Sequence, residues 1–425
     1  MRTAPRLLFL AYYFPPADAI ACVRTWAVAK YLSRAGWQVT VVTPKAEFWR
    51  NERAGKDSES NCAREGITVY RTSHHLGFLV GNGQIENSPF RRLTARLLRK
   101  MVLMGGWEPM LGWTASVRHE VKVQRADSYD VVLATGWPFL SFGLAHELAG
   151  KGGCPYVLDY RDLWTRNPHA PWLNTFRNRR RESKLLREAA GITAVSASMG
   201  HSLEKEFALE RPVNVVTNGY DPEDVADVVP TQFNGLTLVY AGSLYPPVRT
   251  LDPVFAALAA CEAKQREVGK VWTLHHFGPN TEMVREGAVR QGVAHRLVAH
   301  GKVQRSKALS AVAGADVAVV VTSVRSEVTI EEEGILTGKL FEVMALARQI
   351  LVIAPPGSDV DKLIAEMPQA RRFSGQESEQ IAAHLAEVAR AHIDPCKVLP
   401  DTYAWPKLAA RMAETLESTR QKRAT

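Results

Sequence analysis

Short apolar runs alternate with helical patterns along the whole chain. In the first half the runs lie at residues 7–12, 39–43, 131–134, 156–160 and 192–195, and in the second half at 213–217, 236–241, 272–277, 297–300, 317–321 and 350–354. Between the first two runs the apolar positions change to helical spacing, so that Val28, Tyr31 and Leu32 share one face of a helix that ends at Gly36. This alternation predicts an α/β fold in which parallel sheets carry helices on both faces.

Two such series in 425 residues predict two domains, because this length exceeds one ordinary core. The polar, acidic stretch 221–234 is the best candidate for the junction. We expect an N-terminal domain over 1–211 with a helical insert at about 76–125, a C-terminal domain over 212–402, and a final helix over 403–425 that packs back onto the N-terminal domain. Residues 47–65 are polar, and we expect a surface loop there.

Composition narrows the class of protein. Hydrophobic residues make up 46% and charged residues 23%, which is typical of a folded globular chain. The five cysteines form no CxxC pair, which argues against a disulfide framework or zinc site and suits a reducing cytoplasm. The basic, apolar N-terminus lacks a small-residue cleavage site, and no stretch approaches the roughly 20 apolar residues of a membrane span. We therefore expect a soluble or peripheral cytoplasmic protein.

The formal net charge of +9 indicates a polyanionic partner, such as a nucleotide, a nucleic acid or an anionic membrane surface. Much of the charge lies in two stretches, 91–100 and 177–187. These stretches lack a nucleic-acid recognition motif and have few interleaved aromatic residues, so we do not expect nucleic acid as the partner.

The first motif with candidate chemistry is AYYFPPADAIACVR, residues 11–24. A strand ends at paired prolines, and a helix then begins with Arg24 in its first turns. In open α/β sheets ligands bind at the carboxyl ends of strands, where a helix N-terminus favours anions. The alternative is that the prolines only shape a turn and that Arg24 is a solvated surface residue.

The second motif is VYAGSLYPPVRTLDP, residues 239–253. A strand runs into Gly242 and Ser243, where the backbone can approach a ligand closely, and Arg249 precedes a helix. Backbone amides, a hydroxyl and a guanidinium at such a point suit a diphosphate. The motif has neither a Walker lysine nor a GxGxxG pattern, and the alternative is an ordinary turn between strand and helix.

The third motif covers residues 331–360 and contains EEEGILTGKLFEVMA. A helix is predicted to begin at Gly338 and Lys339, with Leu340 on its buried face. Glu342 lies on another face near the helix N-terminus, where a carboxylate can accept hydrogen bonds from a ribose diol.

Taken in order, these motifs resemble those of retaining glycosyltransferases of the large bacterial family four, which have the GT-B fold. The resemblance rests on FPP…R after the first strand, an aromatic-rich insert ending at Gly112 and Trp113, LDYRDLW at 158–164, TNGYD at 217–221 and GKLFEVMA at 338–345, together with the final crossover helix. It covers nearly the whole chain. It implies two Rossmann-like domains with parallel sheets facing a cleft.

The resemblance also implies roles for individual residues. Glu342 would bind the donor ribose, the loop around Lys302 and Val303 would hold the base, and the diphosphate would contact the residues Gly242, Ser243, Arg249, Gly338 and Lys339. Arg161 and Asp162, with Arg24 and Trp137, would lie on the acceptor side. The donor would be a UDP- or GDP-linked sugar, the acceptor a glycan or a polyprenyl- or lipid-linked molecule, and no further cofactor would be required.

Two positions depart from the family pattern. The family often has a glutamate eight residues before Glu342, near the transferred sugar, where this chain has Gly334; Glu333 is the candidate substitute. The first loop has residues 19–21, Ala-Ile-Ala, where the family usually has glycine. These departures leave open a non-catalytic partner subunit, and the fold leaves open an epimerase of sugar nucleotides.

Enzymes of this family use no protein nucleophile, since the leaving diphosphate helps to deprotonate the incoming hydroxyl. We therefore expect Arg249 and Lys339 to act by stabilising charge, with Glu333 near the sugar. The only Asp-x-Asp sequence, 359–361, is not expected to bind metal, and His275 and His276 are expected to be packed within a strand.

The stretch SPFRRLTARLLRKMVLM, residues 88–104, predicts an amphipathic helix. Its apolar positions are Phe90, Leu93, Leu97, Leu98, Met101 and Met104, and its cations are Arg91, Arg92, Arg96, Arg99 and Lys100. One interpretation is a helix lying in the headgroup layer of an anionic membrane, which would make this a peripheral enzyme of the inner face in envelope-glycan synthesis. The other is a helix whose apolar stripe packs on its own domain.

Overall fold

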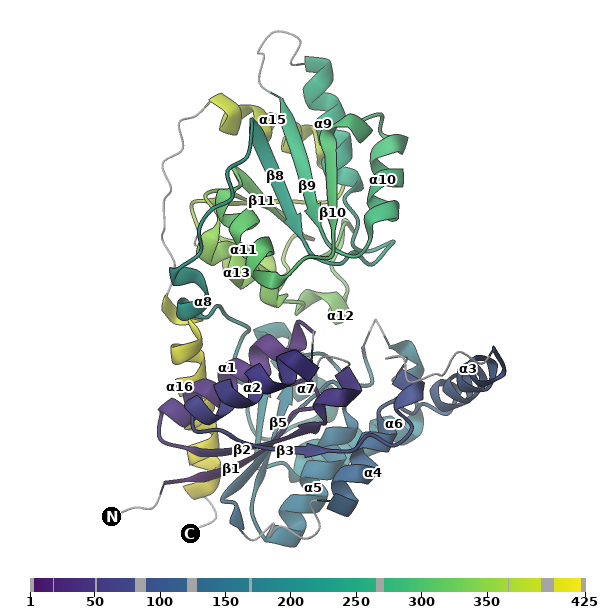
Figure 1. The fold of residues 1–425 in the computed structure, drawn as a ribbon, viewed down its shortest axis with the longest axis vertical. Coiled ribbons are helices and arrows are strands. Elements are labelled where there is room, and N and C mark those ends of the chain that lie inside the picture. The colour runs from purple at the N-terminus through teal and green to yellow at the C-terminus, as the bar shows by residue number, and fades with distance from the viewer. Residues whose placement is uncertain are drawn as a thin grey trace. The chain divides into compact units, whose positions relative to one another are not determined.

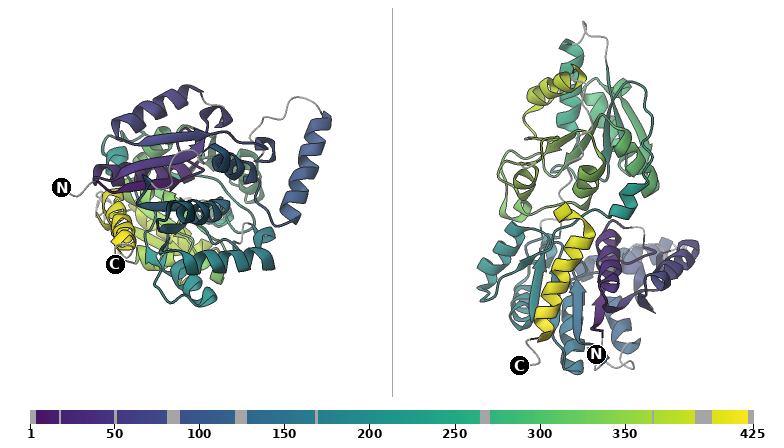
Figure 2. Two further views of the ribbon diagram at one scale, coloured as in Figure 1. Left: turned by 90° about the horizontal axis from the view of Figure 1, so that it is seen from below. Right: turned by 90° about the vertical axis from the view of Figure 1, so that its left-hand side faces the viewer.

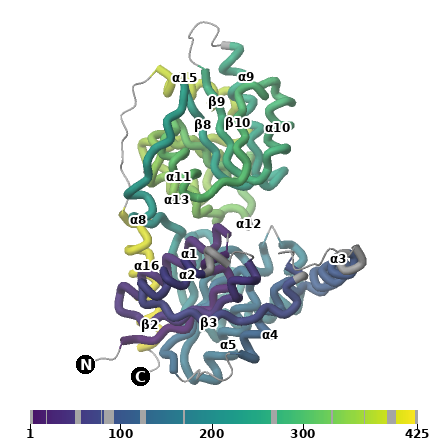
Figure 3. The backbone as a smooth tube through the Cα atoms, in the orientation of Figure 1, coloured from purple at the N-terminus to yellow at the C-terminus, as the bar shows by residue number. Residues whose placement is uncertain are grey.

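The computed structural model shows two compact units. The first comprises Met1–Thr217 with Trp405–Thr425, and the second comprises Asn218–Ala404. The structure describes residues 4–17, 19–49, 52–80, 89–120, 128–167, 170–264, 271–365, 367–390 and 401–421 (Figure 3).

The described residues of the first unit form a seven-stranded parallel sheet in the order β3-β2-β1-β4-β5-β6-β7 (Figure 1). Its strands are β1 Arg6–Leu10, β2 Gln38–Pro44, β3 Thr68–Thr72, β4 Val131–Thr135, β5 Tyr156–Tyr160, β6 Gly191–Ala194 and β7 Asn214–Val215. The direction of the strand order changes between β1 and β4. Such a switch point is where open α/β sheets bind ligands.

Both faces of this sheet are buried. In β1, Leu7 and Phe9 belong to one hydrophobic cluster, and Leu8 and Leu10 belong to the other. The first cluster includes side chains of α1 Ala21–Arg34, α2 Glu52–Arg64 and α16 Trp405–Gln421, and the second includes those of α4 Leu111–Glu120, α5 Leu140–Gly152, α6 Phe176–Glu188 and α7 Ala197–Phe207. Burial on both faces explains why these strands are continuous apolar runs.

The C-terminal helix α16 belongs to the first unit although it follows the second in sequence. Its buried side chains Leu408, Met412 and Leu416 pack in the same cluster as Val28 and Leu32 of α1, and the helix, yellow in Figure 2, runs along this unit. The expected crossover helix is thus confirmed.

The described residues of the second unit form a six-stranded parallel sheet in the order β10-β9-β8-β11-β12-β13. Its strands are β8 Leu236–Ala241, β9 Trp272–Phe277, β10 Leu297–Gly301, β11 Val317–Val321, β12 Ile350–Ile353 and β13 Ala370–Phe373. The helices α9 Asp252–Lys264, α10 Thr281–Arg290 and α15 Ser378–Arg390 cover one face, and α11 Arg305–Gly314, α13 Gly338–Leu346 and α14 Asp359–Ile364 cover the other. The short helices α8 Pro222–Ala226 and α12 Ile330–Glu333 lie in its connections.

The expected fold class, two Rossmann-like α/β units with a returning helix, is confirmed, but two local expectations were wrong and two strands were not expected. Residues 47–65 are not a loop: they contain a short 3-10 turn and α2, which buries only Ser58 and Cys62 among its described side chains. The strand expected at 213–217 is the short β7 and belongs to the first sheet. The strands β3 and β13 were not expected at all.

The insert expected near 76–125 contains α3 Pro89–Met104 and α4. None of the helices in the described ranges is both long enough and apolar enough to cross a bilayer.

Candidate functional site

The switch point of the second sheet brings two loops together. Gly242 and Ser243 follow β8, and Thr322 follows the neighbouring strand β11. Arg249, further along the β8 loop, donates Nε–H to the Thr322 carbonyl at 3.4 Å, and the N–H of Val324 donates to the Val248 carbonyl at 2.8 Å. The two loops therefore border the position at which a doubly wound sheet binds its ligand.

Gly242 makes room for a lysine over this turn. Its backbone φ is +155°, and a Cβ added there would lie 2.0 Å from the Nζ atom of Lys339. The Gly242 N–H donates to the Phe277 carbonyl at 2.7 Å, and the Ser243 carbonyl accepts the Tyr240 hydroxyl at 2.9 Å. The backbone of the turn is thus fixed, and a side chain at position 242 would displace the ammonium group.

Lys339 is a cation placed where a cation is unfavourable. It is the second residue of the nine-residue helix α13, whose N-terminus carries positive partial charge. Burial, reinforced by the nearby Arg249 and opposed by Glu342, lowers the pKa of Lys339 to about 8. Among the described residues no hydrogen-bond acceptor is assigned to its Nζ atom. Two neighbouring cations, one of them at a helix N-terminus, match the charge of a diphosphate.

Glu342 lies one turn further along α13 and is 8% exposed. Its Oε1 atom accepts two hydrogen bonds from Arg305, at 2.7 Å from Nη2 and 3.1 Å from Nε. No hydrogen bond from a described residue reaches Oε2. Arg305 also donates to Asp224 Oδ2 at 2.9 Å, so the guanidinium is held from two sides. The arrangement fixes the carboxylate and leaves one oxygen to accept from a ligand hydroxyl.

Arg305 was not expected as a site residue. The only sequence signal was an arginine at the start of a helix that follows the loop assigned to the base. Its partners Asp224 and Glu342 are 81 and 37 residues away in sequence, so spacing could not reveal the contact.

The other expected donor-side residues are dispersed around this turn. Gly338 is the first residue of α13, and an added Cβ there would meet nothing within 4 Å. Val303, between β10 and α11, packs against the cluster that contains α13 side chains. Glu333 ends α12, and its Oε1 lies 3.4 Å from the ammonium of Lys362. Of these three, Glu333 has the least defined relation to the lysine site, and its role stays a prediction.

His276 lies beneath the turn, fully buried, and its ring stacks on Tyr240 with an interplanar angle of 9°. Burial lowers the pKa of His276 to about 4, so the ring is neutral and adds no charge beside Lys339. His275 Nδ1 lies 3.0 Å from His300 Nε2. Both histidines are therefore packed within strand β9, as expected.

The Asp-x-Asp sequence forms ion pairs with nearby cations. Asp359 lies 3.3 Å from Lys362, and Asp361 lies 3.1 Å from Arg372. Within the described parts of the chain, no three His, Cys, Asp or Glu side chains gather as a metal site.

In the first unit, Arg24 is buried in an ion pair, so the alternative of a solvated surface residue was wrong, while its place on the acceptor side stays a prediction. It is 3% exposed and pairs with Asp159, at 2.6 Å from Nη2 to Oδ1 and 3.0 Å from Nε to Oδ2. It also donates to the carbonyls of Val216 and Thr217. This arginine joins α1 to β5 and to the segment that follows β7.

Asp159 is the partner that the sequence did not identify. Its carboxylate also accepts the hydroxyls of Thr135 at 2.9 Å and Thr193 at 2.8 Å. Burial alone would raise the pKa of Asp159, but Arg24 and these hydrogen bonds outweigh burial and lower it. The pair is 135 residues apart in sequence, although both members lie in motifs that were noted.

The remaining acceptor-side residues lie around the carboxyl ends of β4 and β5. Arg161 donates to the carbonyls of Gly136, of Trp137 at 3.0 Å and of Ala21 at 3.3 Å, which ties the β4 and β5 loops to the start of α1. Trp137 is half-buried, and Asp162 is exposed beside Arg161. Arg161 is thus a positioning residue within this unit, while Asp162 and Trp137 retain accessible surface.

Comparisons with known proteins agree with this architecture. Residues 22–219 match a family described as "Glycosyl transferase 4-like domain". No curated protein matches the sequence.

Among solved structures, HepE from Anabaena in complex with UDP and glucose is similar, with a TM-score of 0.62 and 15% identity over 97% of this chain and 100% of that chain. Sucrose-phosphate synthase from Thermosynechococcus elongatus has a TM-score of 0.60 and 12% identity over 99% and 97% of the two chains. The lipopolysaccharide outer core galactosyltransferase WaaB has a TM-score of 0.56 and 12% identity over 97% and 99%.

At these identities the structural likeness is one of fold. Residues 22–219 thus match a glycosyl transferase 4-like domain, and the two doubly wound units have the fold of the GT-B glycosyltransferases that the chain resembles.

Proposed function

We propose that the chain transfers a sugar, of the hexosyl or N-acetylhexosaminyl type, from a UDP- or GDP-linked donor to a glycan or lipid-linked acceptor, with retention of anomeric configuration. The observation that carries the proposal is the pair of cations, Arg249 and Lys339, over the Gly242 turn with the fixed carboxylate of Glu342 on the same helix as Lys339. A nucleoside diphosphate has the matching groups, since it carries two phosphates beside a ribose diol.

In this mechanism the protein acts by positioning and by charge. Arg249 and Lys339 stabilise the negative charge that grows on the leaving diphosphate, which is the usual large electrostatic contribution to catalysis. The diphosphate takes the proton of the attacking hydroxyl on the face that it leaves, so the configuration is retained without a protein nucleophile. Glu342 binds the ribose, the Val303 loop contacts the base, and Glu333 lies near the sugar.

The structural neighbours support the choice of donor. HepE was solved with UDP and glucose and also with UDP-glucose, and it shares the fold over nearly the full length of both chains. We therefore favour a uridine nucleotide over a guanosine nucleotide. Neither a metal ion nor a further cofactor is part of the proposal, because two side-chain cations supply the neutralising charge.

The acceptor is proposed to meet the first unit at Asp162 and Trp137, with Arg161 holding their loops. A cell-envelope polysaccharide on a polyprenyl or lipid carrier suits the basic N-terminal half, and the protein would then work in the cytoplasm at the inner face of the membrane.

The test is a nucleotide panel on the purified full chain. A ligand that binds only the folded state stabilises it by about 2.7 kcal/mol at a concentration 100 times its Kd, so the correct nucleotide raises the unfolding temperature. We expect UDP to protect more than GDP or ADP, and the matching UDP-sugar to be consumed when acceptor is added. If no nucleotide or nucleotide sugar in the panel protects the chain, the proposal is wrong.

A non-catalytic partner subunit is the second candidate, and the region around Gly334 favours it. The two carboxylates nearest to this glycine in sequence are engaged elsewhere: Glu332 lies 3.3 Å from Arg325, and Glu333 lies 3.4 Å from Lys362. Protection by UDP without transfer or donor hydrolysis, together with stimulation of another transferase, would favour this candidate. Turnover by the isolated chain would exclude it.

A further inference from the structure

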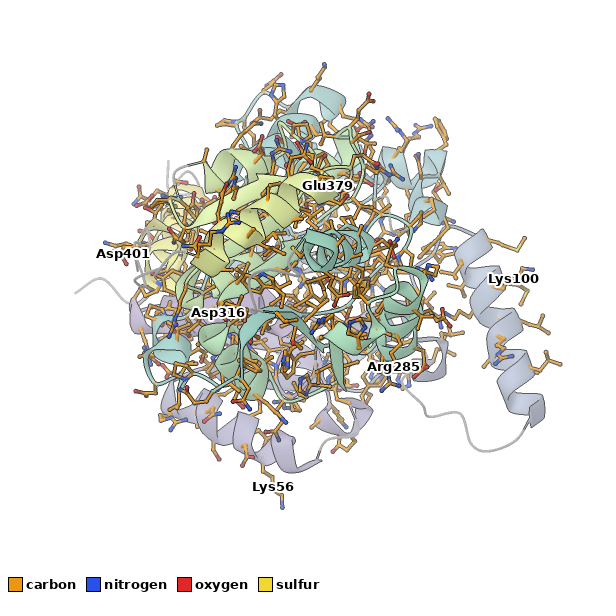
Figure 4. All side chains as sticks on the ribbon, turned by 90° about the horizontal axis from the view of Figure 1, so that it is seen from above. Lys56, Lys100, Arg285, Asp316, Glu379 and Asp401 are labelled. Atoms are coloured by element: carbon orange, nitrogen blue, oxygen red, sulfur yellow. The ribbon has the colours of Figure 1, made fainter. Side chains whose placement is uncertain are left out.

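Helix α3 presents an apolar face to solvent. In Figures 1 and 2 it extends away from the rest of the first unit, and Figure 4 shows the Lys100 side chain on its outer side. Met104 is 76% exposed, and Leu93, Leu97 and Met101 are each more than half exposed. The interpretation in which these side chains pack on their own domain is therefore wrong for the described part of the helix.

The four most exposed apolar side chains of α3 share one side of the helix. At about 100° per residue, Leu93, Leu97, Met101 and Met104 fall within an arc of roughly 80°. Ala95, which is buried, falls nearly opposite. The helix thus buries Ala95 on its inner side and leaves four large aliphatic side chains exposed, which is the reverse of an ordinary amphipathic helix on a globular domain.

The same helix carries five cations and no carboxylate. The side chains of Arg96, Arg99 and Lys100 are exposed, and no ion pair joins them to a carboxylate among the described residues. Arg96 and Lys100 border the apolar arc along one edge. A ligand for this surface must therefore offer apolar volume and negative charge side by side.

The end of α3 is held firmly to α6. Arg177 donates Nη2–H to the Gly105 carbonyl at 2.6 Å and lies 3.9 Å above the centre of the Trp107 ring, and Asn178 donates to the Gly106 carbonyl at 2.8 Å. Phe176, the first residue of α6, is 75% exposed. Apolar side chains and cations thus continue from α3 onto α6, next to a hollow of about 520 Å³ lined by Arg179, Arg180, Lys184 and Arg187, among others.

We propose that the outer face of α3, defined by Leu93, Leu97, Met101 and Met104 with Arg96 and Lys100, is a docking surface for a bilayer that contains anionic lipid. Aliphatic side chains enter the boundary between headgroups and acyl chains while flanking cations bind lipid phosphates. A second copy of the same face is disfavoured, because it would bring two sets of unpaired cations together. Only the role of this surface rests on the proposed function: membrane binding would bring the first unit close to a lipid-linked acceptor.

The test is flotation of the full chain with vesicles of phosphatidylcholine alone or mixed with phosphatidylglycerol. We expect binding to need phosphatidylglycerol and to weaken as salt rises, because exposed charges are screened. Changing Arg96→Gln and Lys100→Gln together should lower the partition coefficient by about fivefold for each cation removed. Leu97→Ser with Met101→Ser should lower it at every salt concentration, since that contribution is apolar.

Matched control variants in the second unit show whether binding depends on the α3 surface itself or only on the protein's total charge and exposed apolar area. Arg285→Gln and Arg348→Gln remove the same net charge from exposed positions, and Val229→Ser with Val289→Ser removes similar exposed apolar surface. Both controls should float as the wild type does. Equal losses in the controls and the α3 variants would overturn the proposal, since overall charge or hydrophobicity would then explain binding.

Two further measurements distinguish a failure of membrane binding from a failure of the proposed nucleotide site. Protection by UDP should be unchanged in the α3 variants, which both shows that they are folded and leaves the donor site out of the comparison. Wild-type protein that stays unbound with phosphatidylglycerol vesicles at low salt overturns the membrane surface, whatever the nucleotide result. A wild type that dimerises, with a monomeric Leu97→Ser, Met101→Ser variant and no vesicle binding, would assign this face to a second copy instead.

Discussion

The depressed pKa of Lys339 predicts that UDP binds more weakly as pH rises through about 8. In the free protein, burial and Arg249 hold this pKa at about 8, well below its ordinary value of 10.5. A bound diphosphate places negative charge beside Nζ and raises the pKa again. Above pH 8 binding must therefore take up a proton. The Kd for UDP should rise about tenfold for each pH unit between the free and bound pKa values.

The stability of the free protein should change in the opposite direction. Because the folded-state pKa of this lysine lies below its unfolded value, the charged form is disfavoured by folding at pH below 8. That penalty is relieved as pH rises from about 8 toward 10.5. Lys339→Met should for the same reason unfold at a higher temperature than the wild type near neutral pH, while binding UDP weakly.

Calorimetric titration of UDP in buffers of different ionisation enthalpy measures both the Kd and the proton uptake. Lys339→Arg is the matched control, since a guanidinium stays protonated throughout this range and its Kd should not depend on pH. The phosphates of UDP are already ionised above pH 7, because their last pKa is about 6. A wild-type Kd that stays constant through pH 8, or the same slope in Lys339→Met, would refute the reasoning.

Three other substitutions follow from the contacts described. Glu342→Ala should lower kcat/KM for the nucleotide sugar by about 10- to 100-fold, the cost of a lost charge-assisted hydrogen bond of about 1.5–3 kcal/mol, while the protein stays folded; unchanged kinetics would remove Glu342 from the site. Arg249→Ala should lower kcat by about 100-fold and raise KM much less, because leaving-group charge grows in the transition state, and an effect on KM alone would contradict this. Asp159→Asn should lower the free energy of unfolding, measured in urea at neutral pH, by about 3–5 kcal/mol, because it leaves Arg24 buried and unpaired. The difference from the wild type should shrink in acid as the wild-type carboxylate protonates. Equal stability of the two proteins at neutral pH would contradict a stabilising role for the Arg24–Asp159 pair.

The strands could be located from the sequence because parallel strands buried on both faces are continuous apolar runs. Four of them, β5, β8, β9 and β11, begin and end at the expected residues. The edge strand β13 escaped notice because its sequence is ARRF and only Phe373 is fully buried. The helix α2 was interpreted as a loop because its sequence, ERAGKDSESNCAR, buries too few side chains to show a helical period.

The sequence indicates only those residues of the candidate donor site whose chemistry is visible in the local sequence. Gly242 and Lys339 could be named because each sits at a strand or helix terminus, where local sequence shows the chemistry. Arg305 and Asp159 could not be named, because their importance lies in partners far away in sequence. Arg24 stands in a motif that the sequence singles out, but only the three-dimensional contacts show that its side chain is buried in an ion pair with Asp159.

The most direct test of the donor site is a crystal structure of the chain with UDP bound. We expect diphosphate oxygens within about 3 Å of Lys339 Nζ and of the Arg249 guanidinium. We also expect a ribose hydroxyl to donate to Glu342 Oε2, with Oε1 still held by Arg305. A nucleotide bound away from the Gly242 turn, or a ribose that does not contact Glu342, would contradict these expectations.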